Sequence, residues 1–279
     1  MKYDLREIIG MIHQDVGFED ITSTALIEPD TIIKARIISR EPGITAGIEL
    51  AKNIFEEFSI NAHALVVDGE KIIAEDVLFE IEGDARTILA LERTVLNLLM
   101  RMCGIATTTY NLVSRVHSVD PNLRVAATRK TTPGLQLLEK EAVKLGGGDT
   151  HRYRLDDCVL IKDNHIAIVG SVVDSVKRAR SRVSFTKKIE IEVENMRDAL
   201  EASIAGADIV MLDNMDPAEV KNVVNAIENQ NLRDNILIEV SGGIGPDNIE
   251  DYACLGVDII STGYLTHSVT ALDLSLEIL

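Results

Sequence analysis

The sequence lacks any apolar run that reaches the length of about 18 residues needed for a membrane span. Charged residues also interrupt its first segment, MKYDLREIIGMIHQD. This pattern argues against both a secretory signal and a basic transit peptide. We therefore expect a cytoplasmic protein with no membrane partner.

Cysteine is scarce as well. The three cysteines, Cys103, Cys158 and Cys254, are widely spaced and odd in number. Such spacing fits neither a disulfide framework nor a cysteine metal site. Reduced thiols in a cytosolic protein are the expected reading.

Positively charged residues are few. The sequence has 28 Lys and Arg residues against 45 Asp and Glu residues, for a net charge of −17. This balance argues against nucleic acid or an anionic membrane as a partner. The segment 124–162 is an exception, with eight cationic and five acidic residues. Neither a Walker-type phosphate loop nor a Ser–His–Asp or Cys–His arrangement is present at motif spacing.

The length of 279 residues allows one large domain or two ordinary ones. Short β-rich runs and helices before residue 85 predict a small α+β unit. Two long helices are then expected, at 85–102 and 106–118, with a hinge near Cys103-Gly104.

From Leu123 onwards, short apolar strands alternate with amphipathic helices, which predicts parallel βα units. The expected strands are 124–128, 158–161, 188–193, 208–212, 236–240 and 257–261. The expected helices are 133–145, 171–181, 195–205, 216–228 and 246–255. Six such strands fit a barrel or a doubly wound sheet equally well, but the polar residues at the strand ends favour a barrel mouth.

Ionisable residues gather at three successive element ends. The strand from Arg124 runs into TRKTTPG, the triple glycine at 146–148 is followed by HRYR, and the strand 158–161 ends in KDNH. Because α/β proteins bind ligands at the carboxyl ends of their strands, this clustering predicts a site for a polyanion.

Two late loops suggest a phosphate site. The strand 236–240 is followed by Ser241-Gly242-Gly243, and the next strand by Ser261-Thr262-Gly263. Glycines at such positions let backbone N–H groups turn toward an anion. Consecutive late loops of this kind hold phosphate in many barrel enzymes.

Carboxylates suggest a metal site. Glu190 and Glu192 alternate with apolar residues, so both lie on one face of their strand. Asp213 follows the next apolar run. Carboxylates at neighbouring strand ends suit Mg²⁺ bound together with substrate phosphates. Salt bridges to the nearby arginines and lysines are the alternative explanation.

These residues also carry a resemblance. TRKTTPG, GGGDTHR and LIKDNH, together with Glu92-Arg93-Thr94, LDN, SGG and LTHS in the same order, resemble the quinolinate phosphoribosyltransferase family over nearly the whole chain. The resemblance implies an irregular, open α/β barrel with an N-terminal α/β sandwich domain. It places the sandwich domain at 1–103 and the barrel at 104–265, with the tail 266–279 packing back on the first domain.

The resemblance further implies the transfer of phosphoribose from phosphoribosyl pyrophosphate to quinolinate with decarboxylation, a step of NAD biosynthesis. Mg²⁺ is the implied cofactor, bound by Glu192 and Asp213, with no organic cofactor. The implied catalytic residues are Lys130, Lys162, Glu192 and Asp213. The implied substrate-binding residues are Arg93, Thr128, Arg129, Lys130, His151, Arg152, Lys162, Glu192, Asp213, Ser241, Gly242, Gly243, Gly263 and His267. A role for Glu190 or Glu194 at the metal stays open.

In the family, the arginine matching Arg93 reaches the active site of a second subunit, which implies a homodimer and leaves a hexamer open. Thr262, Tyr264 and Asp149 depart from the family pattern. A nicotinate-specific enzyme or the molybdenum-operon relative of the family is the nearest alternative. A non-catalytic sugar-phosphate-binding barrel is a more distant one, because binding alone would not need Glu192, Asp213, Lys130 and Lys162 together.

Overall fold

The computed structural model describes residues 4–279, which form two compact units. The N-terminal unit runs to Tyr110 and also contains Thr132–Gly147 and Ser268–Leu279. The barrel unit contains Asn111–Thr131 and Gly148–His267. Residues 1–3, which belong to the expected first domain, lie outside the described residues. The domain bounds expected from the sequence, 1–103, 104–265 and the tail 266–279, stay a prediction.

The N-terminal unit is built on an antiparallel sheet with the strand order β12-β1-β5-β3. The strands are β1 (Ile32–Ser39), β3 (Asn61–Ala64), β5 (Val77–Asp84) and β12 (Leu274–Ile278). A smaller pair is formed by β2 (Gly43–Ile44) and β4 (Lys71–Ile72). The short helices are α1 (Leu5–Val16), α2 (Ile21–Leu26), α3 (Ile48–Glu57) and α5 (Gln136–Leu145). Because β12 comes from the C-terminal tail, the last strand of the chain pairs with the first.

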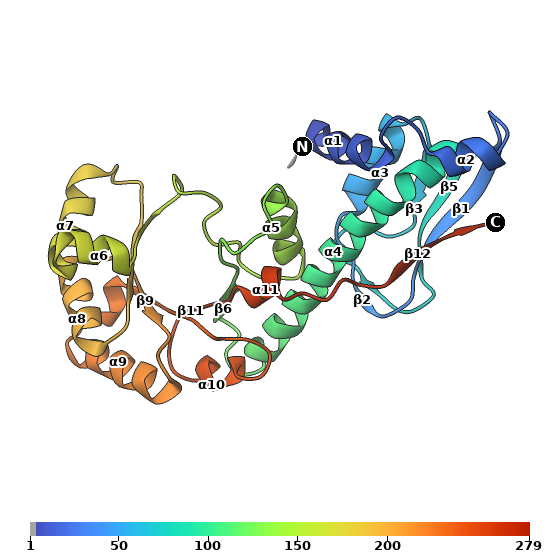
Figure 1. Cartoon of the computed structure of the whole chain (residues 1–279). Coiled ribbons are helices and arrows are strands. Elements are labelled where there is room, and N and C mark those ends of the chain that lie inside the picture. Colours follow the sequence, from blue (N-terminus) through green and yellow to red (C-terminus); the bar gives the residue numbers. More distant parts are fainter. Residues whose placement is uncertain (1–3) are drawn as a thin grey trace. The chain divides into compact units, whose positions relative to one another are not determined.

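One helix replaces the two that the sequence suggested between residues 85 and 118. α4 is continuous from Ala85 to His117 (Figure 1), so the expected hinge at Cys103-Gly104 is wrong. Gly104 has a packing role instead. A Cβ atom there would collide with the carbonyl oxygen of Thr270. The glycine therefore allows the backbone of the tail to approach the helix closely.

The barrel unit contains a six-stranded parallel sheet with the order β6-β11-β10-β9-β8-β7. The strands are β6 (Arg124–Ala126), β7 (Val159–Ile161), β8 (Ile189–Val193), β9 (Ile209–Asp213), β10 (Leu237–Ser241) and β11 (Ile259–Ser261). The helices are α6 (Asp163–Val169), α7 (Val172–Arg182), α8 (Met196–Ala205), α9 (Pro217–Asn229), α10 (Ile249–Ala253) and α11 (Tyr264–His267), with a 3-10 turn at Arg233–Asn235. In Figure 1, α7, α8 and α9 follow one another along the outside of the strands. The expected open α/β barrel is confirmed, whereas α6 was not expected.

The register of the sheet decides which side chains face the barrel interior. Glu192 pairs with Met211, and Met211 pairs with Glu239, so these three side chains form one row across β8, β9 and β10. Asp213 and Ser241 form the next row toward the carboxyl ends. Since alternate residues of a strand face the same side, the interior face carries polar side chains near the carboxyl ends of its strands.

No helix within residues 4–279 combines the length and the apolar character that a membrane span requires.

Candidate active site

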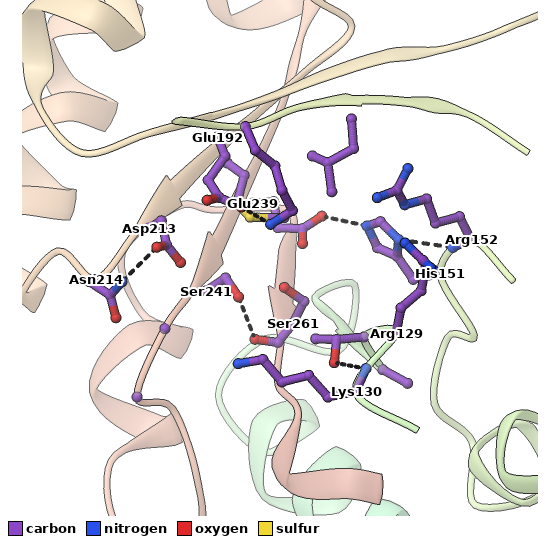
Figure 2. A pocket seen from close by; sticks show the side chains of 17 residues that line it. Arg129, Lys130, His151, Arg152, Glu192, Asp213, Asn214, Glu239, Ser241 and Ser261 are labelled. Atoms are coloured by element: carbon purple, nitrogen blue, oxygen red, sulfur yellow. Dashed lines mark hydrogen bonds and ion pairs between the residues drawn. The ribbon is translucent and has the colours of Figure 1, made fainter. Parts of the chain in front are cut away.

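A cavity of about 420 Å³ opens at the carboxyl ends of the barrel strands. It is lined by residues from every strand of the sheet or from the loop that follows it (Figure 2). The sequence-predicted residues among them are Thr128, Arg129, Lys130, His151, Arg152, Lys162, Glu192, Asp213, Ser241, Gly242 and Gly243. Segments far apart in the sequence therefore meet in one place, as the pattern of strand ends predicted.

A second cavity of about 440 Å³ shares part of its lining with the first. Lys130 and the loop Ser241-Gly242-Gly243 border both, and Gly263 and His267 border the second only. A Cβ atom at Gly263 would lie 2.7 Å from the His267 ring and 2.8 Å from Cδ of Lys130. Gly263 thus leaves the space in which those two side chains pack.

The glycine loop after β10 needs glycine for its backbone conformation. Gly242 and Gly243 have φ angles of 91° and 63°, in the left-handed region that other residues rarely adopt. Asn248 supports the loop, because its Oδ1 accepts a hydrogen bond from the Gly245 N–H and its Nδ2 donates to the Gly243 carbonyl. The helix that follows, α10, is shorter than expected, so the loop rather than a helix terminus shapes this wall.

Two carboxylates lie at the mouth of the first cavity. Glu192 Oε2 is 2.5 Å from Nζ of Lys162, and Asp213 Oδ2 accepts a hydrogen bond of 2.6 Å from Asn214 (Figure 2). Partial burial and the charge of Glu192 raise the pKa of Asp213. Two carboxylates that repel each other in a half-buried site are a suitable ligand pair for a divalent cation, which would relieve the repulsion.

Deeper in the interior, Glu190 and Glu239 are fully buried beside His151. Nε2 of His151 lies 3.4 Å from Glu190 and 3.3 Å from Glu239. Burial lowers the pKa of His151, but the two carboxylates outweigh it and raise the pKa. The raised pKa favours a second proton on the ring, but the backbone N–H of Arg152 donates to Nδ1 at 2.8 Å. A proton on Nδ1 would face that N–H, so we infer from the hydrogen bond that the ring carries one proton, on Nε2.

Sequence reasoning missed Glu239. Its signal was a single carboxylate inside the apolar run Ile236–Val240, without the second, alternating carboxylate that singled out Glu190 and Glu192. Asp149, a departure from the family pattern, accepts a hydrogen bond from the His151 N–H at 2.8 Å. It therefore caps the turn that carries His151. Thr128 has a similar supporting contact, since its hydroxyl oxygen accepts from the Lys130 N–H.

Arg93 lies on α4 in the N-terminal unit. Its side chain is 62% exposed and pairs with the neighbouring Glu92. It is the one predicted site residue that belongs to the N-terminal unit.

A parallel α/β barrel with glycine loops after its late strands and charged side chains at its mouth belongs to the class of barrel enzymes that act on phosphorylated substrates. The comparison with protein families specifies this further. The model of the quinolinate phosphoribosyl transferase N-terminal domain matches residues 20–103, and that of the C-terminal domain matches residues 105–277. The chain belongs to the quinolinate phosphoribosyltransferase family.

Similar proteins cover the chain almost completely. A probable nicotinate-nucleotide pyrophosphorylase (carboxylating) of Methanothermobacter thermautotrophicus is 55% identical over 96% of both chains. One of Methanocaldococcus jannaschii is 51% identical over 99% of this chain and 97% of its own. The crystal structure of nicotinate-nucleotide pyrophosphorylase from Ehrlichia chaffeensis superposes with a TM-score of 0.93 at 32% identity and covers all of both chains. The family expected from the motifs is confirmed.

Proposed function

We propose that the two adjoining cavities carry out the family's reaction. The chain transfers the phosphoribosyl group of phosphoribosyl pyrophosphate to quinolinate and releases pyrophosphate and CO₂. The product is nicotinate mononucleotide, an intermediate of NAD biosynthesis. The observation that carries the assignment to this site is the convergence of four cationic side chains with three carboxylates, Glu192, Asp213 and Glu239, in one cavity, beside a second cavity walled by glycine loops.

Arg129 and Arg152 are assigned to the two carboxylates of quinolinate, with Thr128 and His151 beside them. A guanidinium binds a carboxylate through two parallel N–H groups, which a lysine cannot do. Both arginines line the first cavity. Two adjacent carboxylates on a planar ring require two such groups at fixed positions.

The second cavity is assigned to the 5-phosphate of the ribose. Ser241, Gly242, Gly243, Gly263 and His267 border it. Left-handed glycines turn backbone N–H groups toward an anion without a side chain in the way. The phosphate is thereby held at a fixed distance from the residues of the first cavity.

Glu192 and Asp213 are assigned to Mg²⁺, which would neutralise charge on the pyrophosphate leaving group. Lys130 and Lys162 are assigned to the same leaving group, since a lysine provides a compact charge suited to phosphate oxygens. In the structure, Lys162 also pairs with Glu192. Both lysines then stabilise the charge that develops as the bond to the ribose breaks.

The chemistry needs orientation more than a protein nucleophile. The C1–O bond to pyrophosphate breaks with its electron pair, and the quinolinate nitrogen forms a new bond to C1. The ring nitrogen now carries a positive charge, so it stabilises the electron pair that stays on C2 when the 2-carboxylate departs as CO₂. A proton then replaces the lost carboxylate. Fixed cations and bound orientation lower the barrier of the first step.

We also assign a homodimer in which Arg93 reaches the partner subunit's site, and a cytoplasmic location. An exposed arginine on a long helix is available for such a contact. Sedimentation analysis combined with Arg93→Ala tests the first point. Activity restored by mixing Arg93→Ala with a second inactive variant would support a shared site, and no restoration would count against it.

The reaction is tested by incubating the protein with quinolinate, phosphoribosyl pyrophosphate and Mg²⁺. Nicotinate mononucleotide and CO₂ are expected in equal amounts. Turnover of nicotinate without CO₂ would replace quinolinate by nicotinate as the substrate. Binding of phosphoribosyl pyrophosphate without any turnover would favour a non-catalytic barrel.

A further inference from the structure

Two glutamates without exposed surface lie beside His151, and one of them, Glu239, lines the first cavity together with the histidine. Glu190 comes from β8 and Glu239 from β10, and each is 0% exposed. Within residues 4–279, neither oxygen of Glu190 and only one oxygen of Glu239 has a hydrogen-bond partner. Burying two carboxylates beside one imidazole costs free energy, so the stability of the fold does not explain them.

The other side of the His151 ring faces the backbone. The Arg152 N–H donates to Nδ1 at 2.8 Å, and Nε2 lies 3.3 Å from Glu239 Oε2 (Figure 2). A nitrogen that accepts a hydrogen bond carries no proton, so the ring proton lies on Nε2 and points at the carboxylates. The ring therefore connects Glu239 to the backbone of Arg152.

The backbone at this point needs support. His151 has a φ angle of 50°, in the left-handed region that non-glycine residues adopt infrequently. Its N–H is held by Asp149, which itself bridges to Ala126 of β6. The ring is held by Glu239 and Glu190. Contacts at both ends of the residue thus maintain a conformation that directs the ring inward and the next residue, Arg152, along the cavity wall.

We propose that Glu239 is a positioning residue for quinolinate binding, which holds the Nε2–H of His151 and thereby fixes the ring, the backbone N–H of Arg152 and the direction of the Arg152 side chain. Glu190 Oε2, 3.4 Å from Nε2 of His151, adds negative charge beside the same proton. The inference rests on the assignment of Arg152 to a substrate carboxylate. Glu239 itself is a support and not a catalytic residue.

A divalent cation is the alternative occupant, because the ligand atoms of His151, Glu190 and Glu239 lie within 4.8 Å of one another. A cation would use the lone pair of Nε2 and move the ring proton to Nδ1. There the proton would face the Arg152 N–H that now donates to that nitrogen. The observed hydrogen bond therefore favours a proton between the ring and the carboxylates.

The test compares Glu239→Leu, which removes the acceptor, with Glu239→Gln, which keeps an oxygen that can accept from Nε2. In the full-length protein, Glu239→Leu should raise KM for quinolinate roughly 10- to 100-fold, because small displacements of a binding group have effects of that order. KM for phosphoribosyl pyrophosphate should change less than about twofold. Glu239→Gln should recover most of the quinolinate affinity, and neither variant should melt below the unmodified protein.

Several results would overturn the proposal. A similar rise in both KM values together with a lower melting temperature would mean a structural role only. One divalent metal per chain in the purified protein, absent from Glu239→Leu, would establish a cation site. Histidine side-chain ¹⁵N spectra that show a proton on Nδ1 of His151 would remove the connection to Arg152. Arg152→Lys, measured in parallel, tests separately whether Arg152 binds a carboxylate of quinolinate. Unchanged quinolinate affinity in that variant would reject both this assignment and the positioning role of Glu239.

Discussion

Lys162 and Glu192 form an ion pair across neighbouring strands at the mouth of the barrel, with Nζ 2.5 Å from Oε2. The backbone N–H of Lys162 also donates to Nδ1 of His165 at 3.0 Å, so the lysine is fixed at both ends. A cation held in this way does not need to reorganise when charge develops on the leaving group.

Replacing this lysine should therefore mainly affect the chemical step. For Lys162→Met we expect kcat to fall about 100-fold or more, with a small change in KM for either substrate. Steady-state kinetics measure both. Lys177→Met, on the exposed face of α7, is the matched control and should behave like the unmodified protein. A pure rise in KM for Lys162→Met would contradict the assignment.

Arg152→Lys should raise KM for quinolinate about 10- to 100-fold, because lysine keeps the charge but loses the paired N–H groups. Arg154→Lys provides the control, since Arg154 pairs with Asp156 on the surface and does not line the cavity. Equal effects from the two substitutions would show that Arg152 contributes only to the local field.

Gly242→Ala and Gly243→Ala should differ, although the residues are adjacent and both are left-handed. A Cβ atom at Gly242 would lie 2.7 Å from the backbone nitrogen of Asn214, whereas one at Gly243 would meet nothing within 4 Å. Gly243→Ala should cost only the backbone strain of about 1–2 kcal/mol. Gly242→Ala should in addition displace Asn214 and the carboxylate of Asp213, and raise KM for phosphoribosyl pyrophosphate at least about tenfold. Calorimetric titration with phosphoribosyl pyrophosphate measures the difference, and equal affinities would disprove it.

Two helical glycines of the N-terminal unit should respond in opposite ways to alanine. Gly10 lies on α1 with nothing within 4 Å of an added Cβ, so Gly10→Ala should stabilise the protein by up to about 1 kcal/mol. Gly104→Ala should destabilise it by about 1–3 kcal/mol, because the new methyl group collides with the Thr270 carbonyl. Thermal melting of both variants decides the point. A more stable Gly104→Ala would restore a role for this glycine as a flexible joint.

Asp208 should make stability depend on pH. Partial burial raises the pKa of Asp208, but the hydrogen bonds from the Ile189 N–H and from Arg180 lower it by a larger amount. The pKa of Asp208 is therefore below its ordinary value. A lowered pKa in the folded state gives stability that is present above the unfolded value of about 3.9 and is lost as pH falls through the lower folded value. Asp208→Asn should cost about 1–2 kcal/mol at pH 7 and progressively less below about pH 4.

Urea unfolding at several pH values measures this effect. Asp234→Asn, an exposed aspartate on the 3-10 turn, should show no difference at any pH. A cost for Asp208→Asn that stays constant down to the acid limit of folding would show that the charge of Asp208 is not involved.

The sequence was sufficient to predict the strands of the barrel and most of the residues around its mouth. The reason is local, since polar residues that follow an apolar strand, such as Lys162 or Asp213, must lie at a carboxyl edge of a parallel sheet. The same reasoning did not reach Glu239, because one carboxylate within an apolar strand does not reveal what lies across the barrel. Its partner, His151, is 88 residues away in the chain.

The continuity of α4 could not be predicted from the sequence either. A glycine within a long helical pattern has the same appearance whether it marks a bend or a close contact. Only the position of Thr270, from the far end of the chain, separates the two cases. The conformation of His151 is similar, because its left-handed backbone follows from contacts to Asp149 and Glu239 that no local pattern contains.

Lys130 and the loop 241–243 border both cavities, so the two compartments have a common wall. A ligand that fills only one of them leaves the charged groups of the other exposed to water. Binding energy is therefore available in full only to ligands whose negative groups are separated by the distance between the compartments. On the assignments proposed above, inorganic phosphate, pyrophosphate and free quinolinate each satisfy one compartment, and the intact phosphoribosyl donor would span the wall between them. In this proposed arrangement, the common wall selects the donor by length as well as by charge.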